Sequence, residues 1–365
     1  MAFKIVSSCQ RLPAPRRFGR AGRLAWLGVM LGLLPSTAWA QAFEAVGTRA
    51  QGMGGAFVAV ADDATAVYWN PAGLATGAMV DVQWDLQFRE TIDGPGQPLS
   101  PGEAVSRGTS RLVAVGVPAL GLSYYRLHEA GAAAPTVGAL GSRETESGGG
   151  LQVDAFTTRN FGITLLQSLA DGVVAGATVR VVRGMAASGT ASGAALPDEG
   201  LDAADALTGR ASTTFDVDAG VMASFGIVRV GVVARNLRQP VFQLEAGSGG
   251  VRLRRQVRVG LAIVPRSRPA GTYGPFTVSV DADLTRNDSP QGDRRNIAAG
   301  VERWWAGGRL GARAGVRANT LGPRRAIAAA GFSVGVRRST FVDGQLTRGQ
   351  AGLDRSWGIA TRMTF

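Results

Sequence analysis

The sequence predicts an all-β fold, a transmembrane antiparallel β-barrel of about fourteen strands with an N-terminal hatch segment in its lumen. Three observations predict it: repeated segments alternate apolar with polar residues, short turns alternate with long loops, and the chain ends in an aromatic-rich strand. A soluble β-sandwich also alternates apolar with polar residues, so alternation alone does not separate the two folds. The three observations together favour the barrel.

The clearest alternation lies in VDVQWDLQF, residues 80–88, where every second residue is apolar and the residues between them are Asp or Gln. The same period of two recurs in FDVDAGVMA at 215–223, VSVDADLTR at 278–286 and RLGARAGVRA at 309–318. This period predicts strands with one apolar and one charged face. In a barrel in lipid, the apolar face turns outward.

The strands and their connections follow a regular order along the chain. We expect strands at residues 80–89, 110–117, 119–128, 151–165, 173–184, 212–225, 227–238, 252–264, 276–287, 294–306, 309–318, 325–336, 339–348 and 355–365. Tight turns are expected at Pro118, 169–172, Gly226, 307–308 and 337–338, and long loops at 90–109, 129–150, 185–211 and 239–251. Short turns at one end and longer loops at the other are typical of bacterial outer-membrane barrels.

The C-terminal segment SWGIATRMTF supports the same fold. Its residues on one face resemble the aromatic-ended signal of barrels that are handed to the outer-membrane barrel assembly machinery: Trp357, Ile359, Met363 and Phe365. Four tryptophans lie near the ends of predicted strands, where interfacial aromatic girdles belong: Trp84, Trp304, Trp305 and Trp357.

Residues 1–40 are expected to be a secretory signal peptide. They combine a basic region, an apolar run at 24–34 and the small-x-small sequence Ala38-Trp39-Ala40, so we expect cleavage after Ala40 on the general secretory route. Removing the six basic residues of this segment leaves 33 basic against 27 acidic residues, a net charge of +6. Cys9 would leave with the signal, so no disulfide and no thiolate metal site is expected.

Several function classes are disfavoured by the rest of the sequence. No stretch after Ala40 reaches the roughly eighteen continuous apolar residues that a membrane helix needs. The basic residues after position 40 are all Arg and are scattered along the chain, so no nucleic-acid partner is expected. We therefore predict an exported protein of the outer membrane, in contact with outer-membrane lipid.

The sequence also contains few residues that would support catalysis or metal binding. His128 is the one histidine, and we interpret it as a girdle or loop residue, so neither an enzyme nor a catalytic residue is predicted. Four acidic residues in PDEGLDAADAL suggest calcium, but their spacing does not follow an EF-hand loop: Asp198, Glu199, Asp202 and Asp205. We expect a solvated helical loop there, and no cofactor and no metal.

The segment GGAFVAVADDATAVYWNPAGLA, residues 54–75, precedes the first strand and is expected to form a hatch over residues 41–78, with the barrel at 79–365. Asp62 or Asp63 can cap a short helix through ATAVYWN, and Pro71 would end it because Asn70 is pushed toward extended backbone. A hydrophobic ligand would need an apolar path, and the strand faces supply little of one. Such a path would then have to be formed by the apolar residues of the hatch. The alternative is that these residues only pack the interior of the hatch. They are Phe57, Val58, Val60, Val67, Tyr68 and Trp69.

Charged residues on the polar faces of the strands are expected to face the lumen: Arg180, Asp216, Asp218, Arg258, Asp281, Asp283, Arg313 and Arg317. They could select anions or pair with one another across the interior. We favour pairing, because unpaired charges in a plugged lumen are costly.

The run GTRAQGMGGAFVAVADDATAVYWNPAGLA, residues 47–75, closely resembles the N-terminal signature of the FadL and PorV superfamily of outer-membrane proteins. GVVARNL at 231–237 and AAGVERWWAGGRLGARAGVRAN at 298–319 are similar to late strands of PorV-type members, whereas residues 129–211 show no resemblance. The resemblance implies a fourteen-stranded barrel with an N-terminal hatch in its lumen.

Two functions follow from this resemblance. In the fatty-acid transporter branch, the hatch and an Asn-Pro-Ala motif are linked to passage and sideways escape of hydrophobic ligands, and Asn70, Pro71 and Ala72 occupy that motif here. In the PorV branch, members look like secretion-system components that hold exported cargo, and the WNPAGLA opening is closer to that branch. We predict a passive transporter of hydrophobic small molecules gated by the hatch, with a scaffold for secreted protein cargo as the alternative.

Overall fold

The computed structural model describes residues 44–92, 97–135, 150–194, 196–244, 249–265, 275–287, 293–321, 325–350 and 354–365. All of them belong to one compact unit, residues 37–365. The expected signal peptide at 1–40 lies outside the described residues. Within the described part of the chain, no helix is long and apolar enough to cross a membrane.

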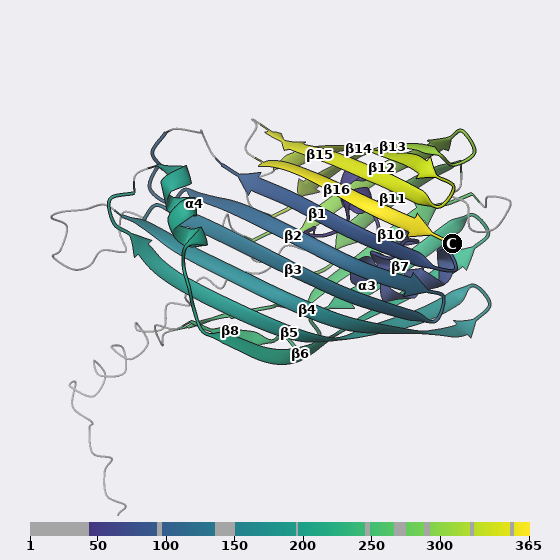
Figure 1. Ribbon diagram of the computed structural model, residues 1–365, viewed down its shortest axis with the longest axis horizontal. Helices are drawn as coiled ribbons and strands as arrows, with labels where there is room; N and C mark the ends of the chain where they lie inside the picture. The colour runs from purple at the N-terminus through teal and green to yellow at the C-terminus, as the bar shows by residue number, and fades with distance from the viewer. Residues whose placement is uncertain are drawn as a thin grey trace, which may run out of the picture. The chain divides into compact units, whose positions relative to one another are not determined.

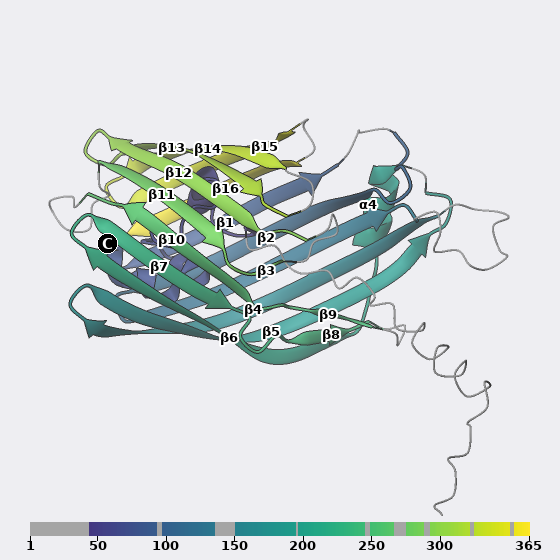
Figure 2. The same ribbon diagram turned by 180° about the vertical axis from the view of Figure 1, so that it is seen from behind.

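Fourteen antiparallel strands form a closed barrel in which strands adjacent in the chain are adjacent in the wall, apart from the step from β7 to β10 (Figures 1 and 2). The barrel closes where β1 pairs with β16, from Asp81 opposite Thr364 to Thr91 opposite Asp354. The strands are β1 Asp81–Thr91, β2 Ala104–Val117, β3 Leu120–Ala133, β4 Leu151–Ala170, β5 Val173–Ala191, β6 Ala211–Phe225, β7 Val228–Arg235, β10 Gln256–Ile263, β11 Phe276–Asp283, β12 Asn296–Trp305, β13 Leu310–Asn319, β14 Ala326–Arg337, β15 Thr340–Gly349 and β16 Asp354–Thr364. The predicted fold class is confirmed, and each predicted strand overlaps one of these.

Strand lengths differ from the prediction at the long-loop end. β2 starts at Ala104 and β5 runs to Ala191, so segments that we expected to be loops continue the wall. β4 is 20 residues long, whereas β10 has 8, and the wall is therefore taller on the side of β2–β6 (Figure 1). At the other end the connections are short turns, except for residues 264–275 between β10 and β11.

The two faces of the wall have opposite polarity. On β6, Asp216 and Asp218 are buried toward the lumen, whereas the side chain of Phe215 is 51% exposed on the outside. The same order holds on β1 and β11, so the apolar face is the outer one, as a barrel in lipid requires.

The aromatic-girdle prediction is wrong for one of its four tryptophans. Trp84, Trp305 and Trp357 are exposed on the outer face, but Trp304 is 6% exposed and faces the lumen, where its ring lies 6.0 Å from that of Phe341. Trp304 and Trp305 are consecutive in a strand, so only one of them can point outward.

The N-terminal segment lies inside the ring of strands from residue 44 to Leu74, and Met79 before β1 is exposed (Figure 1). It contains α2 Thr48–Gly52, α3 Ala66–Trp69 and the 3₁₀ helix η1 Pro71–Thr76. Of the two predicted capping residues, Asp63 bonds the start of α3 and Asp62 does not. The N-cap of α3 is Thr65, whose backbone N–H donates to Asp63 (3.0 Å), whereas Asp62 binds Arg49 instead.

Three elements lie at the long-loop end. The helix α4, Pro197–Asp205, packs Leu201 and Ala204 on the outer face of β2–β4, beside Val105 and Ala132. The strands β8 Val241–Gln243 and β9 Gly250–Arg252 pair with each other, and Phe242 covers the lumen side of β5 at Gly184. The sequence predicted the helix but not this small hairpin.

Candidate functional site

Cross-strand glycine pairs in the wall form seats for the N-terminal segment. A Cβ at Gly176 would lie 2.6 Å from the backbone nitrogen of Ala72, so only glycine admits this approach. Each pair consists of glycines opposite each other on neighbouring strands. The pairs and the hatch residues on them are Gly116 and Gly121 under Leu74, Gly176 and Gly220 under Asn70–Ala72, Gly231 and Gly260 under Val58 and Ala59, and Gly300 and Gly315 under Met53 and Gly54. We call these four pairs the glycine seats.

Asn70 ties the hatch to itself and to the wall. Its Nδ2 donates to the carbonyl oxygens of Val58 (2.9 Å) and Val221 (3.2 Å), and its Oδ1 accepts from the N–H of Ala72 (3.2 Å). The backbone of Asn70 is extended, with φ −163° and ψ 103°, as expected before Pro71. Pro71 and Ala72 pack on Gly176. The motif is therefore fully buried and bonded to β6.

The apolar hatch residues form one packed cluster with the inner wall. Phe57, Val58, Val60, Tyr68 and Trp69 are buried to within 1%. The rings of Phe57 and Trp69 lie 6.0 Å apart, and those of Tyr68 and Tyr125 lie 5.5 Å apart. The wall contributes apolar side chains, which corrects the expectation that the strand faces supply few: Leu112, Tyr125, Leu127, Met222 and Val233.

The expected pairing of lumen charges is found around Arg180. Its guanidinium bonds Asp216 (2.5 Å) and Asp218 (3.1 Å) and also donates to Tyr125 and Asn160. Arg235, which the prediction did not include, lies 3.6 Å from Asp218 and stacks its guanidinium 3.5 Å from the ring centre of Tyr68. This network therefore reaches the hatch.

A second charge network surrounds Arg258, which bonds Asp283 (2.6 Å) and Glu44 of the hatch. Asp281 makes no ion pair among the described residues. Its carboxylate instead accepts the backbone N–H groups of Phe57 and Val58, both at 2.8 Å. Burial would raise the pKa of Glu44, but Arg258 and Arg317 hold it well below its usual range.

A third network joins α2 to the wall of β12–β15. Arg49 bonds Glu302 (2.6 Å), Asp62 (2.5 Å) and Asp63 (3.3 Å), and Arg313 bonds Asp343 (3.2 Å). Arg317 has no carboxylate within ion-pair distance in the described part of the chain, and its Nη1 donates to Gln51 Oε1 (3.0 Å). The prediction missed Arg49 and Glu302, although Glu302 lies directly opposite Arg313 on the next strand.

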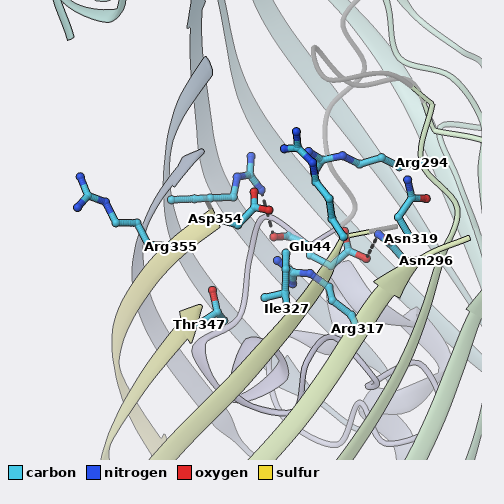
Figure 3. A pocket seen from close by; sticks show the side chains of 11 residues that line it. Glu44, Arg294, Asn296, Arg317, Asn319, Ile327, Thr347, Asp354 and Arg355 are labelled. Carbon is cyan, nitrogen blue, oxygen red and sulfur yellow. Dashed lines mark hydrogen bonds between the residues drawn. The ribbon is translucent and has the colours of Figure 1, made fainter. Parts of the chain in front are cut away.

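Above the hatch, a narrow basic pocket opens toward the long-loop end (Figure 3). It has about 30 Å³ of free volume and is lined by Glu44, Arg294, Arg317 and Asp354 among others. Asn296 Nδ2 donates to Glu44 Oε1 (3.1 Å), as the dashed line in Figure 3 shows. Glu44 and Asp354 are the two acidic residues that line this pocket.

Beside this pocket, an apolar patch lies between the β8–β9 hairpin and the inner face of β4 and β5. It comprises Phe156, Val182, Ala186, Phe242, Val251 and Leu253. The rings of Phe156 and Phe242 lie 5.6 Å apart. We call this group of residues the mouth patch, and the apolar residues of the hatch with those of the inner wall the hatch cluster. A second small pocket is lined by Phe156 of the mouth patch and Leu127 of the hatch cluster, so it lies between the two.

The remaining candidate residues lie on the outer face. His128 bonds Thr157 (2.7 Å) and Asp205 of α4 (2.8 Å), while Asp198, Asp202 and Asp205 face Arg107. Glu199 accepts the N–H of Leu196 at the start of α4 (3.2 Å). No group of three or more His, Cys, Asp or Glu side chains among the described residues could hold a metal ion.

The residues of the expected assembly signal share one face of β16. Trp357, Ile359, Met363 and Phe365 are all exposed on the outside, and Trp357 stacks on Phe88 of β1 with ring centres 6.1 Å apart. Recognition by the barrel assembly machinery remains a prediction.

One family model and several solved structures are similar to this chain. The model of the family described as TraF protein of the F plasmid transfer operon matches residues 102–283, just under half of the chain. A search of the curated proteins finds no match.

Solved structures cover nearly the whole chain. The toluene transporter TbuX of Ralstonia pickettii is 14% identical with a TM-score of 0.58, covering 88% of this chain and 99% of its own. The CymD monoaromatic hydrocarbon channel is 13% identical with a TM-score of 0.56, covering 89% and 99%. A FadL homologue of Pseudomonas aeruginosa is 12% identical with a TM-score of 0.55, covering 90% and 100%. The chain therefore shares its fold with these three proteins, one of which is a FadL homologue, in agreement with the barrel that the N-terminal signature implied.

Proposed function

We propose that this barrel of FadL fold is a passive transporter of hydrophobic small molecules, with the N-terminal segment as its hatch. The observation that carries the proposal is a pair of apolar groups inside a polar lumen, the mouth patch and the hatch cluster, which one small and mainly polar pocket joins. The mouth patch shares a small pocket with the hatch cluster through Phe156 and Leu127. TbuX and CymD, which have the same fold, are named for toluene and monoaromatic hydrocarbons.

The connection between the two groups is closed in this structure. The pocket that joins the mouth patch to the hatch cluster has only about 20 Å³ of free volume, which holds no more than a water molecule or two. Glu44 and Arg89 line it, and Arg89 donates to the backbone oxygen of Glu44 (3.3 Å). Passage of a ligand requires this contact and the Asn70 bonds to open, so the hatch residues are proposed as the gate.

The test is displacement of a fluorescent fatty acid from the refolded barrel, with toluene as competitor. Saturable binding, weakened in Asn70→Ala and Pro71→Ala but not in the outer-face control Ala314→Val, is the expected result. Absence of saturable binding by a barrel that migrates as folded on a heat-modifiability gel would overturn transport.

A second function, a scaffold for protein secretion and surface attachment, has its own support. The matching family model is named for a plasmid transfer operon, and the hatch is joined to the wall by the ion pairs of Arg49 with Glu302 and of Glu44 with Arg258 and by the stacking of Arg235 on Tyr68. In this case the protein would hold exported cargo and transport no lipid-like molecule. Deleting the gene should then leave exported proteins undelivered, and an unchanged secretome together with ligand binding would rule the scaffold out.

A further inference from the structure

The outer face of the barrel carries four arginines in one continuous cross-strand row. Arg111 of β2 is opposite Arg126 of β3, Arg126 is opposite Arg159 of β4, and Arg159 is opposite Arg183 of β5. Arg111, Arg159 and Arg183 are exposed and Arg126 is half-buried. Because neighbouring strands lie about 4.8 Å apart, this arginine row is about 14 Å long.

The arginine row has no acidic partner in the described residues. None of its four guanidinium groups lies within ion-pair distance of a carboxylate there, and the buried Nε of Arg126 has no hydrogen-bond acceptor. Like charges directly opposite each other on neighbouring strands are destabilising. Four in succession therefore call for an anion that the chain itself does not provide.

Another outer arginine shows the contrasting arrangement. Arg355 of β16 is also exposed and has Arg348 opposite it on one side. On the other side, however, it has Glu90, which its Nε bonds at 2.8 Å. The nearby acids of α4 are similarly engaged, since Asp202 and Asp205 bond Arg107 and His128.

The arginine row borders the apolar belt. Two residues along each strand, toward the short-turn end, the next outward row is Val113, Tyr124, Phe161 and Val181, whose side chains are 46–51% exposed. An acyl chain can lie on these side chains while a phosphate contacts the guanidinium groups above them. The end with long loops is the extracellular end of such barrels, so the lipid belongs to the outer leaflet.

We propose that the arginine row binds an outer-leaflet glycolipid whose headgroup carries two phosphates, a lipid of the lipid A type. Arginine holds phosphate in bidentate geometry, so two neighbouring guanidinium groups can clamp one phosphate. Four in a row therefore match two phosphates on one headgroup. This binding is independent of any ligand in the lumen.

The test uses the refolded full barrel in micelles and native mass spectrometry of bound lipid. The test variant is Arg126→Gln with Arg159→Gln, and the control is Arg303→Gln, which removes an outward arginine from the opposite end of the wall. We expect the native protein and the control to bind bisphosphorylated lipid A, and the double variant to bind it at least about tenfold more weakly. The variant Arg126→Lys with Arg159→Lys, which keeps the charge, should recover part of the affinity.

Three other probes separate the sources of phosphate. Monophosphorylated lipid A and phosphatidylglycerol should bind more weakly than the bisphosphorylated lipid, and inorganic phosphate should not displace it at millimolar concentration. Equal binding of all lipids, displacement by inorganic phosphate, or undiminished binding by a folded double variant would each overturn the proposal.

Discussion

Arg180 and Arg183 lie three residues apart on β5, yet they point to opposite faces of the wall and have oppositely charged neighbours. Arg180 points into the lumen, is fully buried, and has Asp216 directly opposite it on β6. Arg183 points outward and has Arg159 opposite it on β4. At Arg180 the chain supplies the neutralising carboxylates itself, whereas at Arg183 on the outer face it supplies none among the described residues.

The largest expected effect comes from breaking the inner arrangement. Arg180→Met leaves Asp216 and Asp218 buried without their main cation, so the free energy of unfolding should fall by about 3–5 kcal/mol. Arg183→Met, the same change on the same strand, should alter it by less than about 0.5 kcal/mol. Urea unfolding of the two variants in detergent measures the difference, and equal effects would contradict the contrast between the two faces.

A change in a glycine seat should have the next largest effect. A Cβ at Gly220 would overlap the side chain of Asn70 and lie 3.0 Å from Pro71 Cδ, so Gly220→Val should destabilise the barrel by about 1–3 kcal/mol. Ala314→Val adds bulk on the outward face of β13 and should be nearly neutral. The midpoint of thermal unfolding tests both, and a neutral Gly220→Val would mean that the hatch does not sit on the wall.

Glu44 should make the hatch contacts depend on pH. Its pKa in the folded protein is held below the ordinary value of 4.5, so its stabilising contribution is fully present above about pH 5 and is lost as the pH falls from there toward the folded pKa. Glu44→Gln should therefore cost about 1–3 kcal/mol at pH 7. The difference from the native protein should shrink toward pH 2, and a difference that grows on acidification would contradict this assignment.

The smallest expected effect concerns the outer arginine row in the absence of lipid. Arg159→Glu places a carboxylate between Arg126 and Arg183, so in lipid-free micelles it should stabilise the barrel by about 0.2–1 kcal/mol. Urea unfolding detects the change. A loss of stability would show that the four arginines do not repel one another.

The sequence was sufficient to predict the strands whose two faces differ in polarity. The fourteen strands were found because alternation persists wherever one face meets the apolar surroundings and the other the lumen, as on β1 and β11. Alternation fades where a further layer covers the outer face, as α4 does over the ends of β2 and β3, and those strand ends were expected to be loops.

The functional site was predicted less completely, because it depends on the register in which neighbouring strands pair. The Asn70 motif and most lumen charges could be named from the chain, but the inner apolar wall could not. In SYYRL, Tyr125 faces the lumen and Tyr124 faces outward, and nothing in two adjacent tyrosines distinguishes them. The outer arginines lie 15 to 33 residues apart in sequence, so they looked scattered until the strand pairing placed them in a row.

The glycine seats set the order in which this protein can be assembled. Each seat exists only after two neighbouring strands have paired in the correct register, and the seats extend from β2–β3 to β12–β13. The hatch precedes every strand in the chain, yet its docking surface is complete only after most of the wall has formed. The hatch is thus synthesised before every strand of the wall but is the last segment to dock, and it can dock only where the enclosing strands have paired in the correct register.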